Sequence, residues 1–192
     1  MKNCVLTLFA VLALVTATQA QDIQVYFSPN GGCTEAIVRT INSAKTSLFV
    51  QAYSFTSAPI AKALTDAKKR KIKIAVNLDD SNETAQYSSA TFLKNAGIET
   101  LIDAKHAIAH NKVIIIDEKI VVTGSFNFSK AAETSNAENL LIITDSTLAG
   151  KYLANWKNHL SHSTRYTGKT TPRPKKDKPS ATEEVLEKIF GK

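Results

Sequence analysis

The stretch HAIAHNKVIIIDEKIVVTGSFNF, residues 106–128, decides the fold of this chain. Its apolar run Val113–Ile116 is typical of a strand that is buried on both faces. Asp117-Glu118 predicts a tight turn into a second strand over Ile120–Thr123. The segment therefore indicates a β-hairpin whose first strand is buried.

Polar side chains stand at the open end of this hairpin. His110 and Lys112 precede the apolar run, and Ser125 and Asn127 follow the second strand, after Gly124, which permits a close turn. Side chains two positions apart on a strand share a face, so we expect these four groups to converge at one edge of the sheet. Lysine, serine and asparagine donate hydrogen bonds to an anion such as phosphate, and a neutral imidazole is a nucleophile or a base. This combination favours an active site over four unrelated strand-end groups.

Strand-like and helix-like segments alternate on both sides of the hairpin. This alternation predicts the fold class α/β, with a mixed β-sheet sandwiched between helices on both faces. The expected strands are 23–27, 48–53, 72–78, 98–102, 112–116, 120–123 and 139–144, and the expected helices are 33–44, 57–70, 83–95 and 146–160.

The two ends of the chain differ in composition from this central domain, residues 21–161. Residues 1–20 resemble a cleaved secretory signal peptide, so we expect a periplasmic or secreted protein that begins at about Gln21. Residues 162–180 carry three prolines and no apolar period, which predicts a basic flexible linker. Residues 181–192 predict a short amphipathic helix, which would dock on its own domain, on a partner or on a membrane surface.

Charge and cysteine content narrow the class of protein. The net charge is +7, and residues 162–192 hold 8 Lys/Arg and 4 Asp/Glu, a net charge of +4. A basic exported protein meets polyanions such as nucleic acid, anionic lipid or cell-surface polymers, and charge alone does not choose among them. Cys4 lies in the predicted signal peptide, so Cys33 would have no intramolecular disulfide partner. We interpret Cys33 as a small buried side chain rather than a reactive thiol.

The spacing of two histidines raises the possibility of a metal site, but the rest of the sequence argues against it. His106 and His110 are four residues apart, a spacing that presents two ligands on a helix. On a strand, however, the same spacing separates them by about 13 Å. No third ligand follows at ligand spacing, and we interpret His159 and His162 as surface groups. The sequence therefore predicts no metal site.

The polar groups also form a longer pattern, H-x-K-x4-D-x6-G-S-x-N. This pattern resembles the signature of the phospholipase D superfamily, and the similarity extends through VYFSPNGG, SAKTSLFVQAYSFTSAPIAKAL and GSFNFSKAAETSNAENLLII. Over about residues 23–160 the chain is similar to the small exported endonucleases of that superfamily, the Nuc type. The resemblance implies the phospholipase D-like fold. The residues that match the pattern are His110, Lys112, Asp117, Gly124, Ser125 and Asn127.

The resemblance assigns a role to each matching side chain. His110 would attack phosphorus to form a phosphohistidine. Lys112 and Asn127 would hold the non-bridging oxygens, with Ser125 assisting. Glu138 would orient the imidazole, a task that carboxylates perform well.

The chain contains this motif once, whereas the mechanism implied by the resemblance uses two histidines. We therefore expect a homodimer with the active site at the two-fold interface, where the two copies of His110 face each other. One ring would be neutral to attack and the other protonated to donate, so that neither a metal nor a cofactor is needed. Asp117 stands in a turn after an apolar strand, and we expect it to be structural rather than catalytic.

The function that follows is a metal-independent phosphodiesterase that cleaves DNA, and RNA as well, with little sequence preference. The basic tail would add attraction to the phosphate backbone. The alternative is a phospholipase D or phosphatidyl-transferase, because the same chemistry serves lipids. A binding protein that has lost activity is a third class, and the intact motif argues against it.

Overall fold

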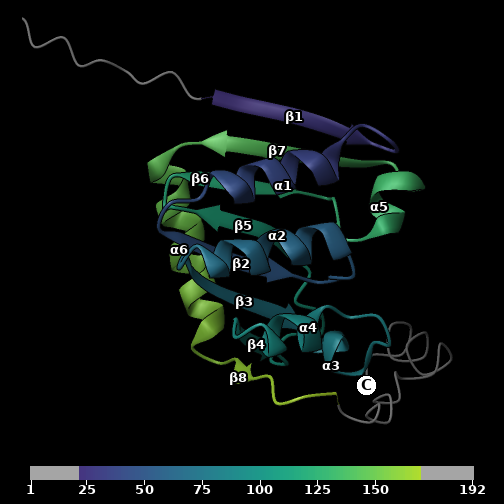
Figure 1. Cartoon of the computed structure of the whole chain (residues 1–192), viewed down its shortest axis with the longest axis vertical. Coiled ribbons are helices and arrows are strands. Elements are labelled where there is room, and N and C mark those ends of the chain that lie inside the picture. Colours follow the sequence, from purple (N-terminus) through teal and green to yellow (C-terminus); the bar gives the residue numbers. More distant parts are fainter. Residues whose placement is uncertain (1–21, 170–192) are drawn as a thin grey trace, which may run out of the picture.

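The structure is a computed structural model that describes residues 22–169 (Figure 1). In this part of the chain, strands form one sheet in the order β1-β7-β6-β5-β2-β3-β4-β8. The strands are β1 (Asp22–Ser28), β2 (Ser47–Ala52), β3 (Lys73–Asp79), β4 (Glu99–Asp103), β5 (Lys112–Ile116), β6 (Ile120–Gly124), β7 (Glu138–Thr144) and β8 (Thr164–Arg165). The helices are α1 (Cys33–Ser43), α2 (Ala58–Lys69), α3 (Ser81–Thr84), α4 (Ala90–Asn95), α5 (Lys130–Thr134) and α6 (Ser146–Leu160).

The sheet is mixed, as the sequence predicted. Strands β2, β3 and β4 are parallel to one another, and every other neighbouring pair is antiparallel. The predicted hairpin is β5 and β6, with Ile115 opposite Val121. Strand β5 is buried along its whole length because helices cover both faces of the sheet.

Each face of the sheet has its own apolar core. On one face, α1, α2 and α4 pack over buried side chains such as Ile37, Leu64 and Ile114 (Figure 1). On the other face, α6 packs Trp156 against Phe49, with ring centroids 5.0 Å apart. The indole nitrogen of Trp156 donates a hydrogen bond of 2.9 Å to the backbone oxygen of Val50, which satisfies the polar group of this buried side chain.

The helix predicted over residues 83–95 is not continuous in the structure. Residues 83–95 form the end of α3 and the whole of α4, separated by an extended turn that begins at Ala85. The side chain of Asn82 anchors this turn: its Nδ2 donates to the backbone oxygen of Tyr53 at 2.6 Å, and its Oδ1 accepts from Ser88 Oγ at 3.1 Å. These tertiary bonds outweigh the weak helix propensity of the segment.

The folded domain also extends further than the sequence indicated. The linker was predicted to begin at residue 162, yet Thr164 and Arg165 pair with β4, and the side chain of Tyr166 is 1% exposed. The Tyr166 hydroxyl lies 2.8 Å from Thr91 Oγ1, which gives the buried phenol a partner. Residues 162–169 therefore belong to the domain, because one aromatic side chain and one short strand fix them to β4.

The remaining predictions about the two ends concern residues 1–21 and 170–192, which lie outside the described residues. Within residues 22–169, no helix has the length and apolarity needed to cross a membrane. Cys33 is fully buried at the start of α1, and this burial raises the pKa of its thiol to about 11. The thiol is thus the small buried group that the sequence suggested.

Candidate active site

Strand register gathers the predicted site residues at one edge of the sheet, on the right in Figure 1. Lys112, the first residue of β5, lies opposite Ala52, the last residue of β2. Gly124, the last residue of β6, lies opposite Leu140 near the start of β7. The start of β5, the end of β6 and the start of β7 therefore share this edge, and each carries a residue of the predicted site.

His110 and Lys112 are in direct contact at this edge. The Lys112 ammonium lies 2.9 Å from His110 Nδ1 and donates to the backbone oxygen of His110 at 2.7 Å. His110 is exposed, whereas Lys112 is only 6% exposed. Burial lowers the pKa of Lys112, while the charges of Glu138 and Asp79 act in the opposite direction. The pair thus presents an open imidazole above a buried cation.

Ser125 and Asn127 follow β6 at the same edge. The Ser125 backbone N–H donates to Asn139 Oδ1 at 2.8 Å, and the Ser125 hydroxyl accepts from the Asn139 backbone N–H at 3.0 Å. The side-chain oxygen of Asn127 is buried and has no hydrogen-bond partner among residues 22–169. A buried polar atom left unpaired costs about 1–3 kcal/mol, so this oxygen calls for an explanation, and a role in binding a ligand is one.

Glu138 is the first residue of β7 and stands at the same edge. Its Oε1 accepts from Asn136 Nδ2 at 3.1 Å, and its backbone N–H donates to Ser28 Oγ at 3.2 Å. Within the described part of the chain, no hydrogen bond joins Glu138 to His110. A shallow depression lies between β1 and this residue, and its lining includes Phe27, Ser28 and Ser125.

Asp117 lies away from this group, beyond the opposite end of β5. Its carboxylate accepts hydrogen bonds from the backbone N–H groups of Lys45, Thr46 and Ser47 at 2.7–2.9 Å, and from the Thr46 hydroxyl at 2.8 Å. Burial alone would raise the pKa of Asp117, but these bonds hold it below its ordinary value. Asp117 therefore ties the hairpin turn to the start of β2.

Comparison with known proteins identifies the family of the chain. The family model described as "Cardiolipin synthase, PLD-like domain" matches residues 37–160, more than half of the chain. The chain belongs to the phospholipase D superfamily. All the signature residues lie inside the matched region.

Two solved structures of this superfamily type are similar over the whole of their length. Nuc, a phospholipase D family member from Salmonella typhimurium, is 40% identical, with a TM-score of 0.73 over 77% of this chain and 99% of that one. NucT from Helicobacter pylori is 27% identical, with a TM-score of 0.72 over 77% of this chain and 100% of that one. The chain is thus a small phospholipase D superfamily protein of the Nuc type.

Curated relatives carry lipid names. A protein named phospholipase D from Rickettsia conorii is 48% identical over 69% of this chain and 66% of its own length, just under two thirds. Mitochondrial cardiolipin hydrolase from Xenopus laevis is 31% identical over 57% of this chain and 52% of its own. The chain therefore spans about half to two thirds of the length of these relatives. The fold is that of a superfamily phosphodiesterase.

The superfamily signature omits two residues that support the imidazole. The ring of Tyr53, just after β2, lies 4.5 Å from the His110 ring and 5.1 Å from the Lys112 ammonium. Asp79, at the end of β3, accepts a hydrogen bond of 2.7 Å from the backbone N–H of Ala109, the residue before His110. Neither could be found from the motif, because both contacts depend on the order of the strands in the sheet. The signal available was that Tyr53 ends the predicted strand 48–53 and that Asp79 directly follows the predicted strand 72–78.

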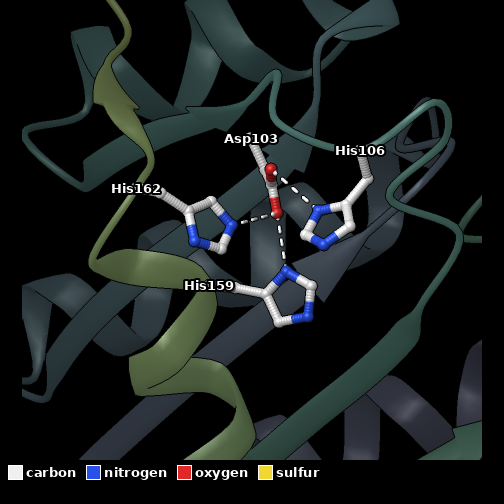
Figure 2. Close-up of side chains that lie close together, drawn as sticks. All are labelled: Asp103, His106, His159 and His162. Atoms are coloured by element: carbon white, nitrogen blue, oxygen red, sulfur yellow. Dashed lines mark hydrogen bonds and ion pairs between the residues drawn. The ribbon is translucent and has the colours of Figure 1, made fainter.

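The other three histidines of the chain form a cluster that the sequence analysis missed (Figure 2). His106, His159 and His162 surround the carboxylate of Asp103, which is 1% exposed at the end of β4. The interpretation of His159 and His162 as surface groups is wrong, because their side chains are only 12% and 15% exposed. His106 and His110 both precede β5, in the connection over residues 104–111, rather than lying on a strand. His159, near the end of α6, and His162, in the turn before β8, reach Asp103 from more than 50 residues later in the chain.

Proposed function

We propose that this protein is a metal-independent phosphodiesterase that cleaves DNA, and RNA as well, with little sequence preference through a phosphohistidine. The observation that carries the proposal is the exposed His110 imidazole held directly against the buried Lys112 cation, at the edge where Ser125, Asn127 and Glu138 also stand. The similarity to Nuc over 99% of that chain supports nucleic acid as the substrate class.

The first step forms a bond between His110 Nε2 and phosphorus, and the bond from phosphorus to the leaving oxygen breaks. For Nε2 to attack, the ring must carry its proton on Nδ1, the atom that now faces the Lys112 ammonium. The Lys112 ammonium has no acceptor atom, so it cannot accept a hydrogen bond from Nδ1–H. When substrate binds, the Lys112 side chain must therefore move away from Nδ1 and donate to the phosphate oxygens instead. The carboxylate of Glu138 then serves as the acceptor for Nδ1–H. Substrate binding and imidazole activation are thereby coupled through one lysine.

The leaving oxygen takes its proton from a second imidazole, His110 of the partner subunit. A water molecule then attacks phosphorus, gives its proton to that second imidazole, and breaks the bond to His110. Lys112, Ser125 and Asn127 stabilise the charge on the non-bridging oxygens in both steps. The chain's own donors and the imidazolium supply the stabilisation, and among residues 22–169 the one cluster of three or more metal-ligating side chains lies elsewhere.

An exposed apolar surface beside the site supports the dimer. On the face of the sheet that bears α6, the edge strand β1 exposes Ile23, Val25 and Phe27 by 49%, 50% and 66%. Leu141 and Ile143 of β7 lie opposite Val25 and Ile23 and are half-buried. Contiguous apolar side chains on a sheet face mark an interaction surface, and this one reaches the edge where Glu138 stands. A second copy that covers it would bring the two sites together.

A lipid substrate is the second candidate, and the names of the curated relatives favour it. A phospholipid presents the same phosphodiester, so the chemistry above applies unchanged to hydrolysis or to phosphatidyl transfer. The predicted helix over residues 181–192 would then bring the site to a membrane surface. Export through the predicted signal peptide is part of both proposals, and N-terminal sequencing of the secreted protein tests it.

One experiment separates these candidates. The protein is incubated in excess EDTA with plasmid DNA and, separately, with vesicles of anionic phospholipid, alongside the His110→Ala variant. We expect nicking and linearisation of the plasmid, which the variant abolishes. Release of a lipid headgroup without DNA cleavage would establish the lipid function instead. DNA cleavage that EDTA abolishes and magnesium restores would contradict the phosphohistidine mechanism.

A further inference from the structure

We propose that Asp103, His106, His159 and His162 form a binding site for a zinc ion that is separate from the catalytic histidine. These side chains converge from different parts of the fold: the end of β4, the connection over residues 104–111, the end of α6 and the turn before β8 (Figure 2). One ligand atom from each lies within 4.8 Å of the others.

The contacts already resemble a ligand shell. His159 Nδ1 lies 2.6 Å from Asp103 Oδ2, His162 Nε2 lies 3.3 Å from the same oxygen, and His106 Nδ1 lies 3.3 Å from Oδ1. In a tetrahedral zinc site with bonds of about 2.0–2.1 Å, neighbouring ligand atoms lie about 3.3 Å apart. Shifts of about 1.5 Å or less, inward for the most distant pairs and outward for the pair at 2.6 Å, would therefore convert this hydrogen-bonded cluster into a coordination shell. The inward nitrogens become ligands once each imidazole carries its proton on the outward nitrogen.

The chemistry of the set points to zinc. Three imidazoles and one carboxylate are nitrogen-rich, borderline ligands that suit zinc, whereas magnesium and calcium prefer oxygen. Four protein ligands complete a tetrahedron, which is typical of structural rather than catalytic zinc. Asp103 Oδ1 also accepts from the Lys105 backbone N–H at 3.1 Å, so one carboxylate oxygen can stay anchored while the other binds the ion. His106, with a side chain 42% exposed, gives the ion a route of entry.

The position of the cluster gives the ion a mechanical role. It stands at the same edge as the catalytic pair, about 14 Å away by three strand spacings. His106 and His110 lie on the same connection between β4 and β5, and Asp79 holds that connection at Ala109. A bound ion would link His106, in the first half of this connection, to the end of β4 and to the end of α6. It would thus stabilise the fold around the catalytic histidine without touching the substrate.

The test uses the untagged protein, because an added histidine tag would bind the same ions. The protein is stripped with chelator, dialysed against micromolar zinc and analysed for metal content, with magnesium as the hard-cation comparison. We expect one zinc ion per chain, no retained magnesium, and a midpoint of thermal unfolding at least about 3 °C above that of the stripped protein. Tetrahedral d–d absorption after loading with cobalt(II) would report the geometry directly.

The chain contains its own matched control, because its fourth histidine is the catalytic one. His159→Ala and the exposed His106→Ala should each lose zinc and its thermal shift, whereas His110→Ala should keep both. Circular dichroism checks that each variant folds. If His159→Ala does not fold, His106→Ala alone provides the test of zinc binding. The proposal is overturned if the wild-type protein retains no zinc, if His106→Ala binds it undiminished, or if His110→Ala loses it. None of these outcomes depends on phosphodiesterase activity, so the two proposals fail separately.

Discussion

At the scale of single residues, His110 and Lys112 touch each other but differ in what they contribute to the fold. His110 is exposed, so His110→Ala should abolish cleavage while leaving the unfolding temperature close to that of the wild type. Lys112→Ala and Asn127→Ala should each reduce kcat by about 10²-fold or more, the usual scale for removing a charge-stabilising donor. Kinetics on plasmid DNA, with unfolding curves for each variant, measure both effects.

His106 is the matched comparison for this series, because it is a histidine on the same connection that does not contact Lys112. His106→Ala should reduce kcat far less than His110→Ala. An equal loss in the two variants, with both folded, would show that the roles of the histidines have been assigned wrongly.

Asp117 should matter for stability rather than for turnover. Asp117→Asn removes the negative charge and replaces one accepting oxygen with a donor, which should cost about 1–3 kcal/mol of unfolding free energy. The folded-state pKa of Asp117 is lowered, so its contribution is fully present above the unfolded pKa of about 3.9 and is lost as pH falls through the folded value. The stability difference between wild type and variant should therefore be constant near neutral pH and shrink below about pH 4.

Denaturant unfolding at a series of pH values measures this difference. A constant gap down to pH 2, or a variant with intact stability but greatly reduced kcat, would contradict the structural role.

The sequence could predict which residues gather at the proposed site because the hairpin of β5 and β6 is a local feature. Lys112 begins β5 and Gly124 ends β6, so the flanking residues His110, Ser125 and Asn127 come to the same edge of the sheet although they lie outside the strands. Tyr53 could not be predicted in this way, because its contact with His110 depends on β2 pairing with β5. That pairing is set by packing of the whole sheet rather than by local pattern.

At the scale of secondary structure elements, Gly124 controls the end of β6. Its φ of 141° is rarely adopted by other residues, and a Cβ there would clash with the backbone oxygen of Asn139. Gly124→Ala should cost at least about 1–3 kcal/mol and displace Ser125 and Asn127, so that kcat falls as well. Gly150→Ala is the control, because Gly150 lies in α6 with open space around it and should be neutral or stabilising by up to about 1 kcal/mol.

Thermal unfolding and kinetics of the two glycine variants measure these effects. Wild-type stability in Gly124→Ala would show that β6 can shift away from β7 without cost.

The ends of a helix or strand could be predicted from the sequence where the apolar periodicity was strong. The prediction was wrong where tertiary contacts set the ends of the element. The helix α6 occupies the predicted residues 146–160. The predicted helix 83–95 is broken because Asn82 bonds to Tyr53, a residue that is remote in sequence. The histidine cluster was missed for a similar reason: the spacing of His159 and His162 was visible, but their meeting with Asp103 required knowing where α6 ends.

At the scale of the whole molecule, the proposed mechanism requires two copies of the chain. Mixing wild-type subunits with an excess of His110→Ala subunits, under conditions that allow exchange, should poison activity because a mixed dimer retains one imidazole. Replacing Phe27, which is 66% exposed on the apolar surface of β1, by aspartate should weaken the dimer and reduce activity in parallel. Analytical sedimentation of the active species measures its oligomeric state. Full specific activity in a monomer would remove the basis for a shared site.

The position of β1 in the sheet also constrains the order in which the strands can pair while the chain is being synthesised. Asp22 pairs with Thr144, so within residues 22–169 the strand β1 has one neighbouring strand, β7, whose paired residue lies 122 positions further along the chain. At synthesis rates of about 5–20 residues per second, β1 waits on the order of ten seconds for β7. Glu138 is the first residue of β7. The edge that carries the proposed site is thus among the last parts to be completed, and a chain interrupted before residue 138 would hold His110 in an unfinished sheet.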